Sequence, residues 1–177
     1  RMAEVTNVQA ITRELDETVP DAYLSDPNAA RRRDIPQDVE VYEINGPFFF
    51  GAAATFRERV SSVSRKRRLL IIRMRNVTAI DSTGMHALQE VIHRSRADGV
   101  RVILSDVHAQ PLVAMGRSGL RDELGEENTF GNLDDALNAA REHLGLPPVE
   151  PLRDVQPTVA RERTREPERR KAAGEGR

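Results

Sequence analysis

The hydrophobic pattern changes its period within residues 69–89, LLIIRMRNVTAIDSTGMHALQ. Residues 69–80 form a mostly apolar run, which is typical of a strand covered on both faces. From Met85 onward the apolar residues recur at three- and four-residue steps, which predicts an amphipathic helix closed by Gly99. The stretch therefore predicts a buried strand followed directly by a helix.

Strands and helices alternate along the central part of the chain, which implies parallel strand pairs joined by right-handed crossovers. The first pair of strands is expected to be antiparallel and to form a mixed edge of the sheet, because Asn45-Gly46 is typical of a type I′ hairpin turn. The predicted elements are a hairpin over 39–51, a helix over 52–64, a strand over 100–107, a short helix over 111–115 with Gly116 and Gly119 as stop signals, and a helix from the Asn132 cap to Gly145. Residues 121–131 are predicted to be irregular, with Phe130 forming a short strand or a plug.

The two ends of the chain differ from its centre. Residues 2–16 have mild helical spacing and predict a short helix or a connector, and the proline-rich segment up to residue 38 predicts a linker. Within it, Arg31 to Arg33 is read as a solvated patch, with contact to anionic headgroups as the alternative. Residues 146–177 are proline- and charge-rich and are predicted to be disordered. The expected organisation is a connector over 1–38, a domain over 39–145 and a charged tail over 146–177.

Composition narrows the function. The 177 residues are 38% hydrophobic, which allows one domain of about 100–130 residues with flanks. A net charge of −1 gives no reason to expect nucleic acid, and the lack of cysteine excludes disulfides and thiolate sites. His86 and His93 lie seven residues apart without further ligand candidates, so no metal, no cofactor and no enzymatic activity are expected. No run reaches the roughly 18 apolar residues that a membrane span needs.

The junction between the strand and the helix of residues 69–89 is the main candidate site. Asp81, Ser82, Thr83 and Gly84 offer hydroxyls and N–H groups at the positive end of a helix dipole. An anion or a nucleotide would be accommodated there, and Ser82 and Thr83 are candidate phosphoacceptors. The alternative is that these residues only cap the helix, since Asp and Ser are preferred N-caps.

Ligand sites in such sheets collect beyond the carboxyl ends of the strands. The turn from Gly51 and Ala52 to Thr55 follows the predicted hairpin, and Ser105 with Asp106 ends the strand over 100–107. We therefore expect these residues to converge on the Asp81 to Gly84 junction.

The apolar strand, NVTAIDSTG, the amphipathic helix and VRVILSDV together resemble the STAS domain, named after sulfate transporters and anti-sigma factor antagonists. The resemblance covers residues 39–144. It implies an α/β fold with a mixed, mostly parallel sheet of about five strands and about four helices. In the antagonist branch the hydroxyl residue directly after the aspartate is phosphorylated by a kinase, and Ser82 matches it.

Residues 35–56, IPQDVEVYEINGPFFFGAAATF, are similar to the opening of the STAS domain at the C-terminus of bacterial SulP anion transporters. This resemblance implies a regulatory domain at the cytoplasmic face of the plasma membrane. Its implied partners are the transmembrane part of the same transporter and cytoplasmic regulatory proteins, with weak nucleotide or anion binding and pairing through the full transporter. The transported anion would be of the sulfate, bicarbonate or dicarboxylate class. The alternative is a free-standing anti-sigma factor antagonist switched at Ser82.

Overall fold

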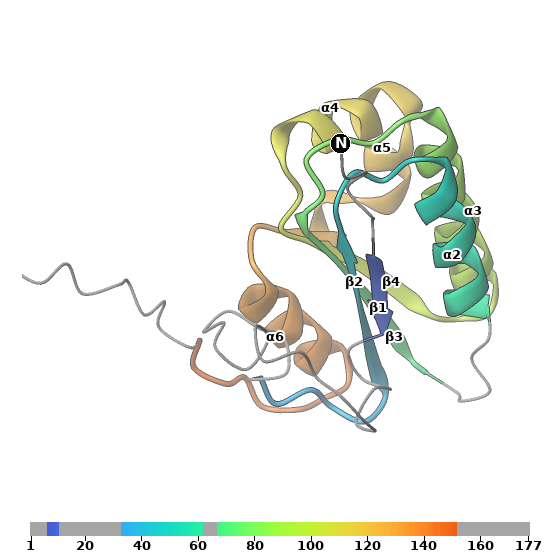
Figure 1. Cartoon of the computed structure of the whole chain (residues 1–177). Helices are drawn as coiled ribbons and strands as arrows, with labels where there is room; N and C mark the ends of the chain where they lie inside the picture. The colour runs from blue at the N-terminus through green and yellow to red at the C-terminus, as the bar shows by residue number, and fades with distance from the viewer. Residues whose placement is uncertain (1–6, 11–32, 62–66, 152–177) are drawn as a thin grey trace, which may run out of the picture.

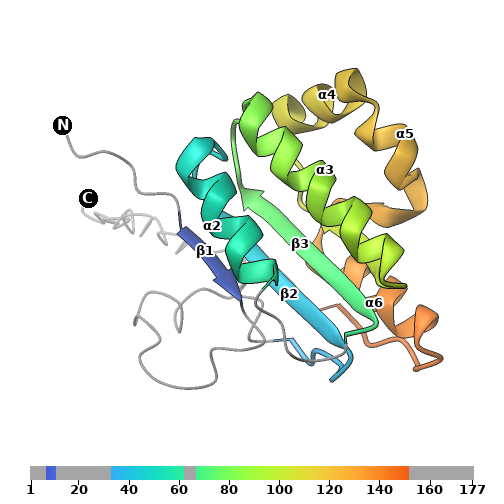
Figure 2. The ribbon, with the colours of Figure 1, turned by 90° about the vertical axis from the view of Figure 1, so that its right-hand side faces the viewer.

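The computed structural model describes residues 7–10, 33–61 and 67–151 (Figures 1 and 2). Five strands form one sheet in the order β1-β2-β3-β4-β5. The strands are β1 (Asn7–Ala10), β2 (Val39–Asn45), β3 (Leu69–Asn76), β4 (Arg101–Ser105) and β5 (Thr129–Phe130). The helices are α2 (Phe50–Ser61), α3 (Ser82–Ala97), α4 (Ala109–Ser118), α5 (Leu120–Leu124) and α6 (Leu133–His143), with a 3-10 turn η2 (Glu126–Asn128).

The sheet is mixed and mostly parallel, as predicted. Strands β2 to β5 run parallel to their neighbours, and β1 pairs antiparallel with β2. Because each parallel strand is added on the same side, right-handed crossovers place α2, α3, α4 and α5 on one face. Helix α6 follows the last strand and covers the opposite face, which gives three layers (Figures 1 and 2).

The sheet has one hydrophobic cluster on each face. Strand β3 lies between β2 and β4 and contributes side chains to both clusters. Leu70, Ile72 and Met74 point into the larger cluster with α2, α3, α4 and α5. Leu69 and Ile71 point into the smaller cluster with α6. The continuously apolar sequence of residues 69–72 is explained by this alternation, because successive side chains of a strand face opposite sides of the sheet.

The N-terminal prediction is wrong for residues 7–10, which form β1 instead of a helix or a connector. Asn7 pairs with Asn45 and Ala10 with Tyr42, and Val8 is buried. This short strand depends on hydrogen bonds to the edge of β2, a tertiary partner that local spacing does not reveal. The rest of the segment lies outside the described residues.

The hairpin predicted over residues 39–51 is also wrong. After Gly46 the chain does not turn back along β2; Phe48 instead forms an isolated parallel bridge with Ile80, and α2 begins at Phe50. Pro47 offers no backbone N–H for a hairpin ladder. The antiparallel neighbour of β2 is therefore β1.

Two boundaries in the second half differ from the prediction. Gly116 lies inside α4, whereas Gly119, with a φ of 80°, ends it. Residues 120–124 form α5, which overlaps the segment 121–131 predicted to be irregular, because Leu120 and Leu124 pack one turn apart into the larger core. The Asn132 cap of α6 and the short strand at Phe130 agree with the prediction.

Candidate functional site

The loops that follow β2, β3 and β4 leave the sheet at the carboxyl ends of these parallel strands. We call this end of the domain the rim. The β3–α3 loop is anchored to the β2–α2 loop, since Asp81 N donates to the Phe48 carbonyl at 3.4 Å and Phe48 N donates to the Ala79 carbonyl at 2.9 Å. The Asp81 to Gly84 junction therefore lies beside the residues that open α2.

Asp81 is the N-cap of α3. Its carboxylate Oδ1 accepts a hydrogen bond from Gly84 N at 2.8 Å, and its carbonyl accepts one from Met85 N at 2.9 Å. A carboxylate therefore already occupies the positive end of the α3 dipole and takes one of the N–H groups that a ligand would use. This arrangement supports the capping reading and disfavours a second anion at the same place.

The two candidate phosphoacceptors differ in access. Ser82, the first residue of α3, is exposed, whereas Thr83 is partly buried. Gly84 is required by packing, because a Cβ atom there would lie 2.1 Å from the Phe48 carbonyl oxygen. Of the four junction residues, Ser82 presents its side chain most openly to a kinase or a partner.

The other predicted site residues do not all join this junction. Gly51 is exposed and Ala52 is buried in the first turn of α2, next to Phe48, and the two share the rim with Asp81. Ser105 does not share the rim. It is fully buried, and its side chain lies on the same face of β4 as that of Ile103, which packs in the core beneath α6. The convergence predicted for Ser105 is therefore wrong, because alternation turns its side chain to the opposite face of the sheet.

A groove of about 780 Å³ lies between α3 and α4 and opens beside Ser82. Ile80, Met85, Val113 and Ala114 give it an apolar lining, and Ser82 and Arg117 are among its polar lining residues. The sequence reading missed this groove, because it depends on how α3 and α4 pack side by side.

Gln110 fixes the floor of the groove. Its amide oxygen accepts a hydrogen bond from Ile80 N at 3.0 Å, and its amide nitrogen donates to the Ile80 carbonyl at 3.4 Å. The side chain thus completes the pairing of Ile80 on the side away from Phe48, as a neighbouring strand would. Helix α4 is thereby tied to the residue just before Asp81.

A second polar cluster lies on the α6 face of the sheet. Glu43, Arg73 and Ser105 are aligned across β2, β3 and β4 by the strand register, and all three are buried. Glu43 Oε2 and Ser105 Oγ have no hydrogen-bond partner in the part of the chain that the structure describes. The signal in the sequence is the placement of charged residues inside otherwise apolar strands.

Arg73 of this cluster and two further arginines, Arg33 and Arg75, border a cavity of about 420 Å³ at the start of α6. Each pairs with a carboxylate: Arg33 Nε with Asp134 at 3.0 Å, Arg73 Nε with Asp106 at 3.4 Å, and Arg75 Nε with Glu43 at 2.6 Å. Burial lowers the pKa of Arg73, and the Arg75 charge lowers it further, while Glu43 and Asp106 act in the opposite direction. These pairs neutralise the cluster, so it resembles a structural network more than an anion site.

The prediction of a solvated patch over Arg31 to Arg33 is therefore wrong for Arg33. Its side chain is only 6% exposed and joins the start of the domain to the first turn of α6 through Asp134. Arg31 and Arg32 lie outside the described residues.

The two histidines of α3 form no metal site with the other residues that the structure describes. His86 is exposed, and His93 Nε2 lies against the Glu123 carboxylate. Within residues 7–10, 33–61 and 67–151, no group of three or more His, Cys, Asp or Glu side chains is arranged to hold a metal ion. In the same ranges no helix has the length and apolar content needed to cross a bilayer.

Comparison with known proteins places this chain in a family. The model of the STAS domain matches residues 30–136, more than half of the chain, so the chain belongs to the STAS domain family. Within that family it is similar to the STAS domains of SulP-type sulfate transporters. A sulfate transporter family protein from Wolinella succinogenes has 39% identity and a TM-score of 0.66, and the match covers 68% of this chain and 99% of that structure.

Two further relatives agree with this placement. The STAS domain of a SulP transporter from Vibrio cholerae has 30% identity and a TM-score of 0.57, over 70% of this chain and 98% of that domain. Sulfate transporter 1.1 of Arabidopsis thaliana is 26% identical over 109 residues, which cover 55% of this chain and 17% of that protein. The chain spans about a fifth of the length of the curated sulfate transporters it matches.

Proposed function

We propose that this chain is the cytoplasmic regulatory and interaction domain of a SulP-type secondary anion transporter, without catalytic activity of its own. The observation that carries the proposal is the match to nearly the whole length of two bacterial structures, a sulfate transporter family protein from Wolinella succinogenes and the STAS domain of a SulP transporter from Vibrio cholerae. The rim supports it, because exposed Ser82, two exposed phenylalanines and an open groove present a contact surface, whereas the buried charged residues Glu43 and Arg73 are paired with opposite charges. In this proposal the domain acts by binding the membrane part and biasing its conformations.

The first test is the gene upstream of the codon for Arg1. Codons for transmembrane helices in the same reading frame agree with the proposal, whereas a reading frame that begins at Met2 contradicts it. The second test is uptake of labelled sulfate, bicarbonate and dicarboxylates by the full-length protein in liposomes. Deletion of residues 1–177 should change the uptake rate or the assembly of the transporter, and unchanged uptake and assembly would contradict a regulatory role.

A phosphorylation switch at Ser82 is the second candidate, favoured by the exposure of this hydroxyl at the start of α3. A phosphate there would add up to about two negative charges at a contact surface and beside the Asp81 carboxylate. Incubation with cellular kinases, followed by mass spectrometry, should find the phosphate on Ser82 and lose it in Ser82→Ala. A chain that stays unmodified at Ser82 under all growth conditions would contradict this candidate.

We expect anion or nucleotide binding at the start of α3 to be weak, because Asp81 already caps Gly84. Titration with sulfate or a nucleotide, followed by amide chemical shifts, measures this directly. Weak affinity should appear as small shifts at Ser82, Thr83 and Gly84 that saturate only at millimolar concentrations. Tight binding at these amides would contradict the argument from the Asp81 cap.

A further inference from the structure

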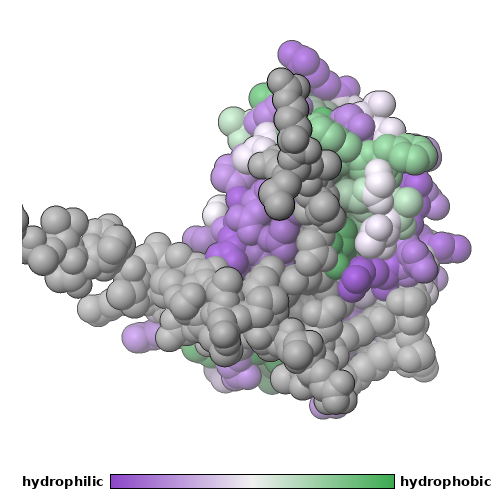
Figure 3. All heavy atoms as spheres, in the orientation of Figure 1, coloured by the Kyte–Doolittle hydropathy of each residue, from purple (hydrophilic) through white to green (hydrophobic). Residues whose placement is uncertain are grey.

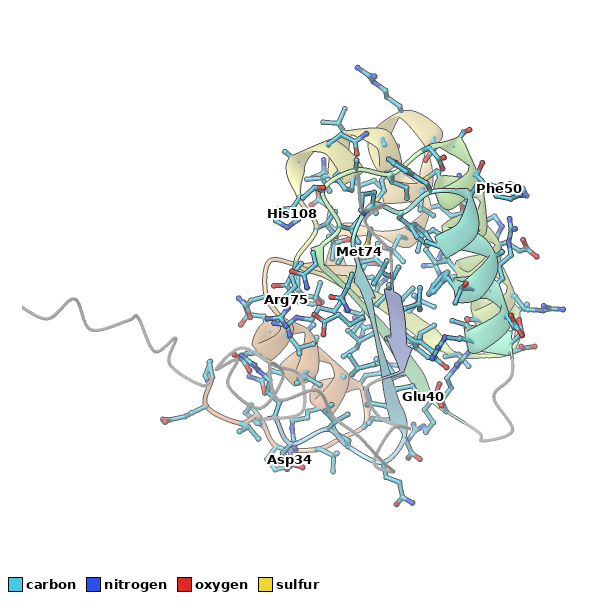
Figure 4. All side chains as sticks on the ribbon, in the orientation of Figure 1. Asp34, Glu40, Phe50, Met74, Arg75 and His108 are labelled. Atoms are coloured by element: carbon cyan, nitrogen blue, oxygen red, sulfur yellow. The ribbon has the colours of Figure 1, made fainter. Side chains whose placement is uncertain are left out.

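The rim carries an unusual share of the exposed apolar side chains. Among the described residues, five large hydrophobic side chains are exposed, and three of them are at or beside the rim: Phe49 (45% exposed), Phe50 (76%) and Val113 (53%). Phe50 opens α2 and lies at the outer edge of the molecule (Figure 4). The space-filling view shows hydrophobic surface in the same region (Figure 3). Exposed apolar groups gathered at one end of a domain are typical of an interaction site.

The α3–α4 groove adds shape to this surface. It opens beside Ser82, and Val113 lies exposed along its wall. Its apolar lining suits hydrophobic side chains, while Arg117 and Ser82 offer polar contacts. Phe49 and Phe50 lie on the other side of the β3–α3 loop, directly after Phe48, which is hydrogen-bonded to Asp81.

This surface is held in place before any partner binds. Gln110 fixes Ile80 from one side, and the Phe48 bridge fixes it from the other. Gly84 lets α3 approach the Phe48 carbonyl closely. A preorganised surface loses little conformational entropy on binding, so its exposed phenylalanines are well suited to act as anchors.

The path of the chain indicates what covers the rim. Strand β1 begins at Asn7, which pairs with Asn45 at the last residue of β2. Any segment that precedes β1 therefore reaches the domain at the same end of the sheet as Phe49, Phe50 and the groove. The sulfate transporters that match this chain are about five times longer than the matched region, so most of such a protein lies outside it.

We propose that Phe49, Phe50 and the α3–α4 groove together dock an apolar segment from the cytoplasmic side of the transporter's membrane part. This inference rests on the proposed function and adds the surface and the chemistry of the contact. The membrane part is the occupant that the topology favours, because its connection to β1 arrives at this end of the sheet.

Photocrosslinking in the full-length protein, in membranes, tests the surface. Position 49 is replaced by p-benzoylphenylalanine, and the control carries the same group at Val149, which is 48% exposed and is hydrogen-bonded to Asn138 of α6. Peptides of the membrane part should be crosslinked from position 49 and not from position 149. Substitution of Phe50→Ser or Val113→Ser should lower the yield from position 49 by roughly tenfold, because burial of one large apolar side chain is lost. Val149→Ser should leave the yield unchanged.

Several outcomes would overturn the inference. If crosslinks from position 49 join only a second copy of this domain or an unrelated protein, the occupant is not the membrane part. If the membrane part is crosslinked from position 149 and not from position 49, the proposed function stands and the docking surface is wrong. If the full-length protein has no transmembrane segment, both the proposed function and this inference fail.

Discussion

Substitution of Gly84 by alanine tests whether close packing of α3 against the β2–α2 loop holds the rim in place. A Cβ atom at position 84 would lie 2.1 Å from the Phe48 carbonyl oxygen and 3.0 Å from both Ile80 Cγ1 and Phe48 Cδ1. Real Cβ atoms essentially never approach closer than 3.0 Å, so the helix or the loop must move by about 1 Å. The Phe48 carbonyl also accepts the hydrogen bond from Asp81 N, which such a movement would weaken.

The size of the effect follows from two opposing terms. Overpacking in a well-packed region costs about 1–3 kcal/mol. The upper half of this range applies here, because the Cβ atom would meet the Phe48 carbonyl oxygen, a backbone atom that cannot rotate away as a side chain can. Alanine recovers about 0.8–1 kcal/mol through its better helix propensity. The net loss should be about 1–2 kcal/mol, which lowers the unfolding temperature of a chain of this size by about 2–8 °C.

Thermal unfolding followed by circular dichroism measures this loss, and Gly116→Ala is the matched control. Gly116 lies inside α4, and a Cβ atom there would meet nothing within 4 Å. The same substitution should therefore raise the unfolding temperature by about 2–4 °C through helix propensity alone. If Gly84→Ala is as stable as the wild type, or gains stability as Gly116→Ala does, the reasoning from close packing is refuted.

Three further substitutions test other parts of the structure. Gln110→Ala removes both side-chain hydrogen bonds to Ile80 and should cost about 1–2 kcal/mol, with faster amide exchange at Ile80; unchanged exchange would contradict the role of Gln110. Glu43→Gln leaves Arg75 without its buried carboxylate and should cost about 1–3 kcal/mol in urea unfolding, whereas a neutral result would mean that the network adds no stability. For His143, burial and then Arg101 and Arg68 lower the pKa below its ordinary value. Because the folded state binds this proton less readily, stability should fall as the pH drops below about 6.5, and His143→Gln should reduce this fall; an identical pH profile would contradict it.

The sequence alone determined the central strand–helix unit and the last helix. The apolar run of residues 69–72 needs cover on both faces, and the change of period after Asp81 predicts a helix. Asn132 and the two aspartates that follow it fix the start of α6 through local capping, so no tertiary partner is needed to predict it. The N-cap role of Asp81 was likewise one of two readings that the residue types supported.

Only the tertiary structure decided which residues meet. Strand β1 forms because the edge of β2 offers hydrogen bonds, and α5 forms because Leu120 and Leu124 find the larger core. A strand that is apolar on both faces does not reveal which face each residue takes, so the burial of Ser105 beneath α6 could not be predicted. The groove beside Ser82 and the ion pair of Arg33 with Asp134 join segments 30 to 101 residues apart in sequence. Local patterns fix elements because their hydrogen bonds are local, whereas sites depend on packing between elements, which no local pattern encodes.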